Sequence, residues 1–349
     1  MARKAPGRHE RKGLSLVDIT RIFPDDATAE SWFVNNRWPA GVSCPQCGSR
    51  NVQQRPSRKP QPYRCRDCRK DFSVKTGTLM HNSKLGLQTW AIALYLLSTG
   101  LKGTASMKIH RDLGVTQKTA WFLAHRIRET WRERGERFRG PLEMDEVYIG
   151  GKERNKHESK KLKAGRGAVG KAPVVGVKDR GSKRITARPV ESVNKVTVEA
   201  ILKEAAAAQA SVYTDEGSVY DGLPNHESVN HSAGEYVRGQ AHVNGMESFW
   251  SLLRRGYYGT FHKMSFKHLE RYVNEFAGRH NIRDLDTIQQ MSAMAASLDG
   301  KRLRYKRLIK GNGLSSGARE TAARAGAPAS ATGCPESSTP TGAADRQTA

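Results

Sequence analysis

Apolar residues near the start of the chain recur at helical spacing. The first stripe consists of Leu16, Ile19, Ile22 and Phe23. A second stripe follows in Ala29, Trp32 and Phe33. Asp26 and Thr28 are the candidate N-caps of this second helix, and Trp38-Pro39 ends the pattern. We therefore expect a short helical module at this end of the chain.

A longer helical pattern extends from Leu85 to about Glu136. Its first helix is built from Leu87, Trp90, Ile92, Ala93, Tyr95, Leu96 and Leu97. After Gly100, two further helices are expected at Thr104–Leu113 and Thr116–Arg128, with Thr116 as the N-cap of the second. This is the pattern of a helix-turn-helix, whose second helix would carry Gln117, Lys118 and Thr119 toward a DNA major groove. A plain antiparallel helix pair would give the same pattern.

From residue 142 to about residue 283 the pattern changes to strands. Strands are expected at Leu142–Gly151, Pro173–Lys178, Arg184–Val190 and Ser211–Thr214. Asp179-Arg-Gly-Ser182 is a hairpin turn between the second and third strands, and Val196–Gln209 predicts an amphipathic helix before the fourth. Three strands, a helix and a fourth strand are the order of an α/β ribonuclease H-like domain, with a mixed sheet covered by helices.

Three carboxylates stand at informative places in this pattern. Asp145 lies in the first strand, Asp215 follows the fourth, and Glu247 opens a segment with helical spacing. In the ribonuclease H-like order the first and fourth strands are neighbours, so Asp145 and Asp215 would meet despite 69 intervening residues. Carboxylates from separate elements are typical of Mg²⁺ or Mn²⁺ sites, and two such ions can drive phosphodiester cleavage. Any one of these acids alone would be an ordinary surface residue.

The charge of the chain indicates a polyanionic partner. Its 349 residues contain 59 Lys and Arg against 34 Asp and Glu, a formal net charge of +25. Double-stranded DNA is the leading candidate, because each phosphate contact releases counterions. We find neither an apolar run long enough for a membrane span nor a signal peptide, so we expect no membrane association and a cytoplasmic, nucleoid-associated protein.

Four cysteines form two C-x2-C pairs separated by 17 residues: Cys44, Cys47, Cys65 and Cys68. This spacing is typical of a structural zinc site with four thiolate ligands. Strand-like residues at Val52, Tyr63 and Phe72 favour a zinc ribbon, and Gly48 suits the tight turn after the first pair. Disulfide pairing is the alternative, which the expected intracellular location disfavours.

Several motifs together resemble a known family. They are Asp145-Glu-Val-Tyr-Ile-Gly-Gly-Lys152, Asn155-Lys-His157, Gly165-Arg-Gly167, Val174-Val-Gly176, His242-Val-Asn-Gly-Met-Glu247-Ser-Phe-Trp-Ser-Leu-Leu-Arg254-Arg-Gly256, Lys267-His-Leu269 and Arg271-Tyr272. With the zinc ribbon, this set resembles bacterial insertion-sequence transposases that have an N-terminal zinc ribbon and a DDE catalytic domain, related to the Merlin group. The resemblance covers about residues 15 to 290.

The resemblance implies cleavage of DNA at insertion-sequence ends and transfer of the freed 3′-hydroxyl strand into target DNA by a homo-oligomer. It assigns Asp145, Asp215 and Glu247 as ligands of two Mg²⁺ or Mn²⁺ ions, and Arg254, seven residues after Glu247, as a basic residue near the DNA. Because some members have Asn at the third position, Asn244 stays an alternative ligand. Two other functions stay open: a DNA-binding protein with an inactive catalytic domain, and a non-transposing nuclease.

The expected organisation has six parts. These are a disordered basic arm (1–14), a helix with the zinc ribbon (15–82), a helical DNA-binding region (83–138), the catalytic domain (139–290), a basic extension (291–310) and a disordered low-complexity tail (311–349). The basic loop Lys152 to Lys171 would lie along the DNA backbone or remain a solvated loop.

Overall fold

The structure is a computed structural model that describes residues 12–132, 137–151, 155, 157–158, 161, 168, 170–215, 217–229 and 244–314. All of them belong to one unit, Met1–Ser316. The basic arm up to residue 11, most of the loop from Lys152 to Lys171, and the tail from residue 315 lie outside the described residues.

The chain begins with two short helices and a small antiparallel sheet. Helix α1 spans Leu16–Ile22 and α2 spans Asp26–Arg37. The N-cap of α2 is Asp25, whose side chain accepts a hydrogen bond from the Thr28 backbone, so the expected caps Asp26 and Thr28 were wrong by one or more residues. The sheet has the order β1-β2-β3, formed by Val52–Gln54, Tyr63–Cys65 and Asp71–Phe72.

A helical region follows the small sheet. It contains α3 (Leu87–Thr99), α4 (Ser106–Leu113) and α5 (Gln117–Arg128). Gly114, with a φ of +62°, ends α4 in the left-handed conformation, and the expected N-cap Thr116 is confirmed because its side chain accepts from the Thr119 backbone. Only the first turn of α5 is largely exposed, since most of the helix from Ala120 onward is buried.

Two helices near the other end of the described chain complete this region. They are α9 (Thr287–Ala296) and α10 (Tyr305–Ile309). Met291, Met294 and Leu308 are buried in the same hydrophobic core as Phe33 of α2 and Leu94 of α3. The segment expected as a basic extension therefore packs against the N-terminal helices.

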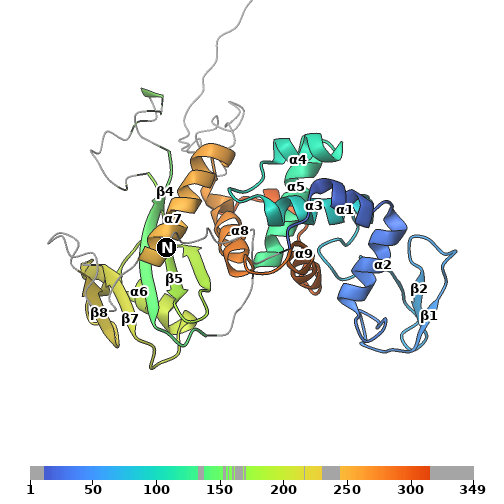
Figure 1. Ribbon diagram of the computed structural model, residues 1–349, viewed down its shortest axis with the longest axis horizontal. Coiled ribbons are helices and arrows are strands. Elements are labelled where there is room, and N and C mark those ends of the chain that lie inside the picture. Colours follow the sequence, from blue (N-terminus) through green and yellow to red (C-terminus); the bar gives the residue numbers. More distant parts are fainter. Residues whose placement is uncertain are drawn as a thin grey trace, which may run out of the picture. The chain divides into compact units, whose positions relative to one another are not determined.

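The larger sheet has five strands in the order β6-β5-β4-β7-β8 (Figure 1). They span Leu142–Ile149 (β4), Ala172–Asp179 (β5), Ile185–Pro189 (β6), Val212–Asp215 (β7) and His226–Val229 (β8). Strands β4, β5 and β6 are antiparallel, whereas β7 is parallel to both β4 and β8. The fold class is the expected α/β ribonuclease H-like one, with one strand, β8, that we did not predict.

Helix α6 spans Lys195–Ala205 and is shorter than expected. It ends because Ala206 adopts an extended conformation and pairs with Phe138, whose backbone bonds to Ala205 and Ala207. The predicted extension to Gln209 was wrong because alanine is a good helix former, whereas this pairing is a tertiary contact.

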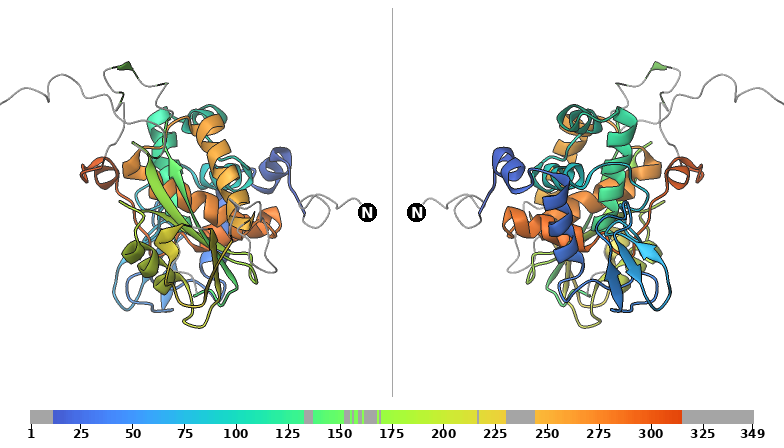
Figure 2. Two further views of the ribbon diagram at one scale, coloured as in Figure 1. Left: turned by 90° about the vertical axis from the view of Figure 1, so that its left-hand side faces the viewer. Right: turned by 90° about the vertical axis from the view of Figure 1, so that its right-hand side faces the viewer.

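Helices cover both faces of the larger sheet. On one face, Leu142 and Met144 pack with Val198 of α6. On the other, Val147 packs with Phe249 of α7 (Asn244–Gly256), beside which α8 (Leu269–Asn281) lies. Figure 2 shows α7, in orange, alongside the long green strands. A π-helical turn at Tyr257–Phe261 and a 3₁₀ turn at Phe266–His268 connect α7 to α8.

A buried ionic cluster joins α8 to α5. Glu275 accepts from Arg128 Nε at 2.6 Å and from Arg279 at 2.7 Å, and the Glu275 side chain has no exposed surface. Removing one member would leave a buried charge without its partner, which costs about 3–5 kcal/mol. The cluster therefore fixes how α8 packs on the helical region. No helix in the described part of the chain is long and apolar enough to cross a membrane.

Candidate functional site

The four cysteines converge on one point. Their sulfur atoms all lie within 4.8 Å of one another, with 3.6 Å between Cys44 and Cys68 and 3.6 Å between Cys47 and Cys65. Four sulfurs at about 2.3 Å from one tetrahedral zinc ion would lie about 3.8 Å apart. All four cysteines are free thiols, so the disulfide alternative is wrong, and the donor set fits a structural zinc ion.

The backbone explains why each C-x2-C pair can offer two sulfurs to one ion. Gly48 and Arg69, the residues after each pair, are both left-handed, with φ of +74° and +60°. In each turn the first cysteine's backbone N–H donates to a carbonyl five residues later, that of Ser49 or Lys70. The expected role of Gly48 is confirmed, and Arg69 takes the equivalent place in the second turn.

Asp145 and Asp215 lie on adjacent parallel strands. Leu142 pairs with Val212 and Glu143 with Tyr213, so continuing this register by two residues places Asp145 level with Asp215. Both side chains are half-buried at this level of the sheet. The two acids are therefore brought together as the strand order predicted.

This pair carries negative charge that the described residues do not neutralise with an ion pair. Burial, together with the charges of Asp215 and Glu146, raises the pKa of Asp145 to about 7, although hydrogen bonds from the Glu146 backbone and the Trp250 indole act in the opposite direction. Such crowding of carboxylates favours a bound cation at the site.

Helix α7 approaches the sheet beside Asp145. The Trp250 indole donates to Asp145 Oδ2 at 3.0 Å. Gly176, the β5 partner of Asp145, makes this approach possible: a Cβ there would lie 2.8 Å from the Trp250 ring and closer still to Met246. The absence of a side chain at Gly176 therefore decides how close α7 comes to β4.

Glu143 fixes the start of α7. Its buried carboxylate accepts from the Met246 backbone N–H at 3.0 Å and from Arg180 Nε at 2.9 Å. Backbone N–H groups in the first turn of a helix have no partner inside the helix, so a carboxylate is well placed there. Glu143 lies two residues before Asp145 and thus on the same face of β4.

Glu247, Asn244 and Arg254 are all exposed on α7. At about 100° per residue, Glu247 points about 60° from Trp250 and about 20° from Arg254, whereas Asn244 points about 120° from Trp250. Since Trp250 reaches Asp145, Glu247 is directed nearer to Asp145 than Asn244 is. His242, and Glu216 next to Asp215, lie outside the described residues.

Asp145, Asp215 and Glu247 do not place their ligand atoms around one point. Among the described residues, only the four cysteines place three or more possible ligand atoms within 4.8 Å of one another. Ligand oxygens of Asp145, Asp215 and Glu247 therefore do not all lie within this distance of one another. The sheet brings the two aspartates together, and Glu247 is on α7, the helix that packs against β4.

A cavity of about 500 Å³ opens at the far end of the exposed stripe of α7. It is lined by Lys102, Ser251, Arg254, Arg255, Tyr258 and Gly259. Arg254 therefore shares this cavity with two further cations, Lys102 and Arg255, an arrangement that is suited to an anionic strand.

Glu143, Gly176 and Tyr220 were not predicted as parts of the site. The Tyr220 hydroxyl donates to Glu146, the acid next to Asp145, from the opposite face of the sheet. For Glu143 a signal was present, because an acid two residues before Asp145 shares its face of the strand. For Gly176 and Tyr220 the role depends on contacts between distant elements.

Comparison with known proteins agrees with this architecture. Residues 24–71 match the family model of the transposase zinc-ribbon domain, and residues 137–281 match that of the ISXO2-like transposase domain. The chain is also 29% identical over 279 residues to an uncharacterized protein in transposable element ISH50 of Halobacterium salinarum, covering 75% of this chain and 93% of the relative. The chain therefore belongs to the insertion-sequence transposases that combine a zinc ribbon with an ISXO2-like transposase domain.

Proposed function

We propose that this transposase cleaves double-stranded DNA at the ends of an insertion sequence and joins the freed 3′-hydroxyl strand to target DNA. Asp145, Asp215 and Glu247 hold Mg²⁺ or Mn²⁺ between the sheet and α7. Two such ions would activate the attacking oxygen and stabilise the leaving oxygen. Asn244 is the alternative third ligand.

The observation that carries the proposal is the level placement of Asp145 and Asp215 on neighbouring parallel strands, with α7 anchored beside them. The raised pKa of Asp145 supports a cation at this place, because burial and the Asp215 charge both oppose its ionisation. Neither the zinc ribbon nor the helical region requires such an acidic pair.

Three further residues would support the metal site. Trp250 orients the Asp145 carboxylate, and Glu143 holds the first turn of α7 so that Glu247 faces the pair. Arg254 lies seven residues, or about 10 Å, along α7 from Glu247. Arg254 would therefore hold a phosphate beside the cleaved bond.

The remaining parts bind and place the DNA. The zinc ribbon and the first turn of α5, with Gln117 and Lys118 exposed, contact the element ends, and the protein acts as a homo-oligomer on the DNA of the nucleoid. A DNA-binding protein with an inactive catalytic domain and a non-transposing nuclease are the alternatives. The nuclease would cut without joining, and the inactive protein would bind without cutting.

The test is cleavage of a labelled duplex that carries the element's own ends, with Mg²⁺, Mn²⁺ or EDTA. Asp145→Asn and Asp215→Asn should each lower the cleavage rate at least 10³-fold while DNA binding persists, because a lost carboxylate removes a metal ligand. Glu199→Gln, an exposed acid on α6, is the matched control and should cut like wild type. Full activity of either aspartate variant would overturn the proposal.

A further inference from the structure

The segment after α9 combines a high positive charge with a fixed path. Residues 301–310 contain six Lys or Arg side chains and no acid: Lys301, Arg302, Arg304, Lys306, Arg307 and Lys310. Leu303 and Leu308 in the same segment are buried in the core of the helical region. The cations are therefore held in place by the apolar residues between them.

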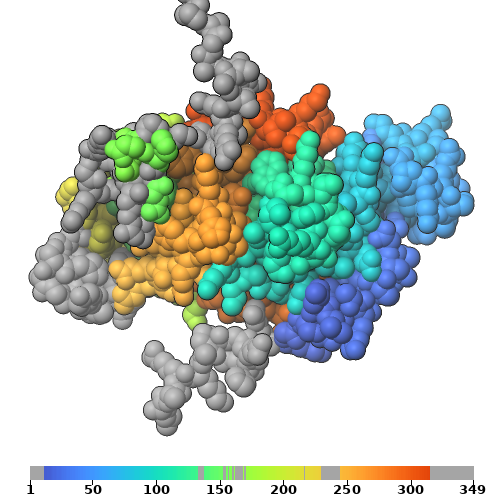
Figure 3. Space-filling view, turned by 90° about the horizontal axis from the view of Figure 1, so that it is seen from above, coloured from blue at the N-terminus to red at the C-terminus, as the bar shows by residue number. Residues whose placement is uncertain are grey.

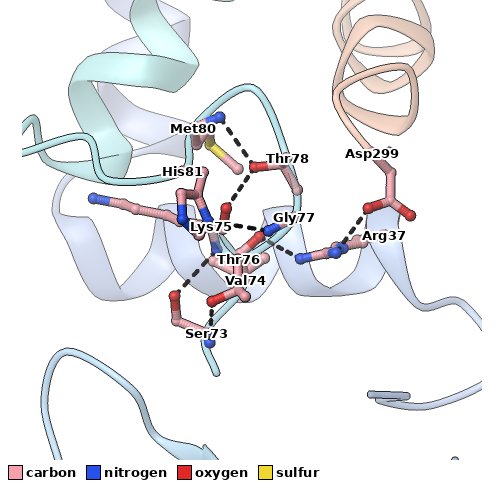
Figure 4. Close-up of polar contacts among 10 residues, drawn as sticks. All are labelled: Arg37, Ser73, Val74, Lys75, Thr76, Gly77, Thr78, Met80, His81 and Asp299. Carbon is pink, nitrogen blue, oxygen red and sulfur yellow. Dashed lines mark hydrogen bonds and ion pairs between the residues drawn. The ribbon is translucent and has the colours of Figure 1, made fainter. Parts of the chain in front are cut away.

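Polar contacts fix both ends of this segment. Before it, Asp299 bonds Arg37 of α2 at 2.7 Å, beside the loop of residues 73–81 (Figure 4). Gly300 N–H donates to the Gly77 carbonyl at 3.1 Å. At the far end, Lys267 Nζ donates to the Ile309 carbonyl at 2.8 Å. Ordering these residues costs conformational entropy. A basic tail that served only to keep the protein soluble would not need this order.

The segment also lies against α5. The Tyr305 ring contacts the Phe122 ring, with 5.4 Å between centroids, and Lys118 Nζ lies 4.9 Å from the centre of the Tyr305 ring. Seen from above, the orange-red C-terminal segment lies against the teal surface of α4 and α5 (Figure 3). Because Lys118 is in the exposed first turn of α5, the segment and that turn belong to one surface.

A cavity of about 170 Å³ lies between this segment and the end of α5. Its wall carries one acid and five cations: Glu129, Arg132, Arg271, Lys301, Arg302 and Arg307. Glu129 is paired with Arg271, and Lys301 Nζ donates to the Thr130 carbonyl at 3.0 Å. Within the described part of the chain, Arg132, Arg302 and Arg307 take part in no ion pair.

The positive charge around this cavity favours a ligand of opposite charge. The C-terminal end of α5 contributes only about half a negative charge, far less than the charge of Arg132, Arg302 and Arg307, the three cations that form no ion pair with the described residues. At about 170 Å³ the cavity has room for a phosphate group, and the described residues that line it include no aromatic ring on which a base could stack. Guanidinium groups bind phosphate oxygens through paired, charge-assisted hydrogen bonds.

We propose that this cavity, lined by Arg132, Arg271, Lys301, Arg302 and Arg307, binds a backbone phosphate of double-stranded DNA. It forms a second DNA contact, separate from the α7 residues beside the catalytic acids, and it extends the surface at the first turn of α5. The identity of the polyanion as DNA rests on the proposed function.

The experiment measures binding of the full chain, with zinc bound, to two unrelated fluorescein-labelled 30-base-pair duplexes as salt is varied. Arg302→Ala with Arg307→Ala should lower the slope of log K against log salt by about 1, equally for both duplexes, because one phosphate contact is lost. Arg302→Lys with Arg307→Lys should keep the slope. The control is Lys195→Ala with Lys203→Ala, exposed cations on α6 whose loss removes the same charge.

The proposed phosphate pocket would be overturned if the alanine pair keeps the wild-type slope. It would also be overturned if the α6 control lowers the slope by the same amount. Cleavage of the end-bearing duplex at low salt separates this result from the proposed function. If the alanine pair shows the expected slope change but wild type never cuts with Mg²⁺ or Mn²⁺, the pocket proposal stands and the catalytic proposal fails. If the slope stays the same while wild type cuts, the catalytic proposal stands and the pocket fails.

Discussion

At the scale of single residues, the site depends on the groups around the acids as much as on the acids themselves. The positions of Asp145 and Asp215 could be predicted, because a carboxylate within a strand or at its end is visible in the pattern of apolar residues. The contribution of Gly176 could not, because it depends on Trp250 and Met246, residues of another element that meet it only in the folded chain. Sequence shows a glycine there but not what fills the space above it.

Gly176→Ala should impair cleavage without removing any acid. The new methyl group would lie 2.8 Å from the Trp250 ring, so α7 must move away from Asp145. Overpacking of this kind costs about 1–3 kcal/mol, and a displacement of about 1 Å at a site can cost roughly 10²-fold in rate. Urea unfolding and single-turnover cleavage measure the two effects.

The matched control is Gly311→Ala, because a Cβ at Gly311 would meet nothing within 4 Å. It should match wild type in both measurements. Wild-type cleavage by Gly176→Ala would show that the close approach of α7 to β4 is not needed for the site.

At the scale of elements, regular apolar spacing predicted most helices and strands, and the exceptions have local causes. Strand β8 was missed because His226-Glu-Ser-Val229 has one apolar residue and so no strand pattern. Helix α6 was predicted too long because the pairing of Ala206 with Phe138 cannot be seen in an alanine-rich sequence. The zinc ribbon was predictable because its ligands are fixed by covalent spacing.

The zinc ribbon does not have a core of its own. Trp38, at the end of α2, contacts the rings of both Tyr63 and Phe72, and Cys44 and Cys65 belong to the core of the helical region. Loss of the metal should therefore disturb the C-terminal end of α2 as well as the small sheet.

Removal of zinc with a chelator should raise hydrogen exchange in residues 41–72 and around Trp38, while β4 and β5 keep their protection. Cys47→Ser should bind less zinc and behave like the chelated protein. Unchanged exchange after the metal has been removed would contradict a structural role for it.

At the scale of the whole molecule, the packing of the helical region on α8 could not be predicted, because it depends on buried polar groups. Besides the Arg128–Glu275–Arg279 cluster, His125 of α5 contacts His268 and Tyr272 with 4.9 Å and 5.6 Å between ring centres. Burial, together with nearby positive charge, lowers the pKa of His125 well below its usual value and that of His268 to about 4. Both rings are therefore neutral in the folded protein at neutral pH.

Acid should weaken this packing. The unfolded chain protonates both imidazoles below about pH 6.5, whereas the folded chain resists until about pH 4, so the free energy of unfolding falls as pH drops through that interval. The charged or titratable groups that act on His125 are Arg128, His268 and Arg271. His125→Phe keeps a ring but removes one titration, so its stability should fall less between pH 7.5 and 5.0 in urea unfolding. Equal losses in the two proteins would contradict this account.

The proposed metal-dependent site that cuts and joins DNA belongs to the scale of the whole molecule, because two strands and one helix that are separated in sequence would have to assemble it. The most direct measurement is a single-turnover assay of cleavage and strand joining on end-bearing DNA with Mg²⁺, comparing Glu247→Gln with Asn244→Ala. We predict that Glu247→Gln loses both steps at least 10³-fold, while Asn244→Ala stays within tenfold of wild type, because Glu247 shares the side of α7 that reaches Asp145. Activity of Glu247→Gln together with loss in Asn244→Ala would move the third ligand to Asn244. Cleavage and joining by both variants would contradict a site that includes α7.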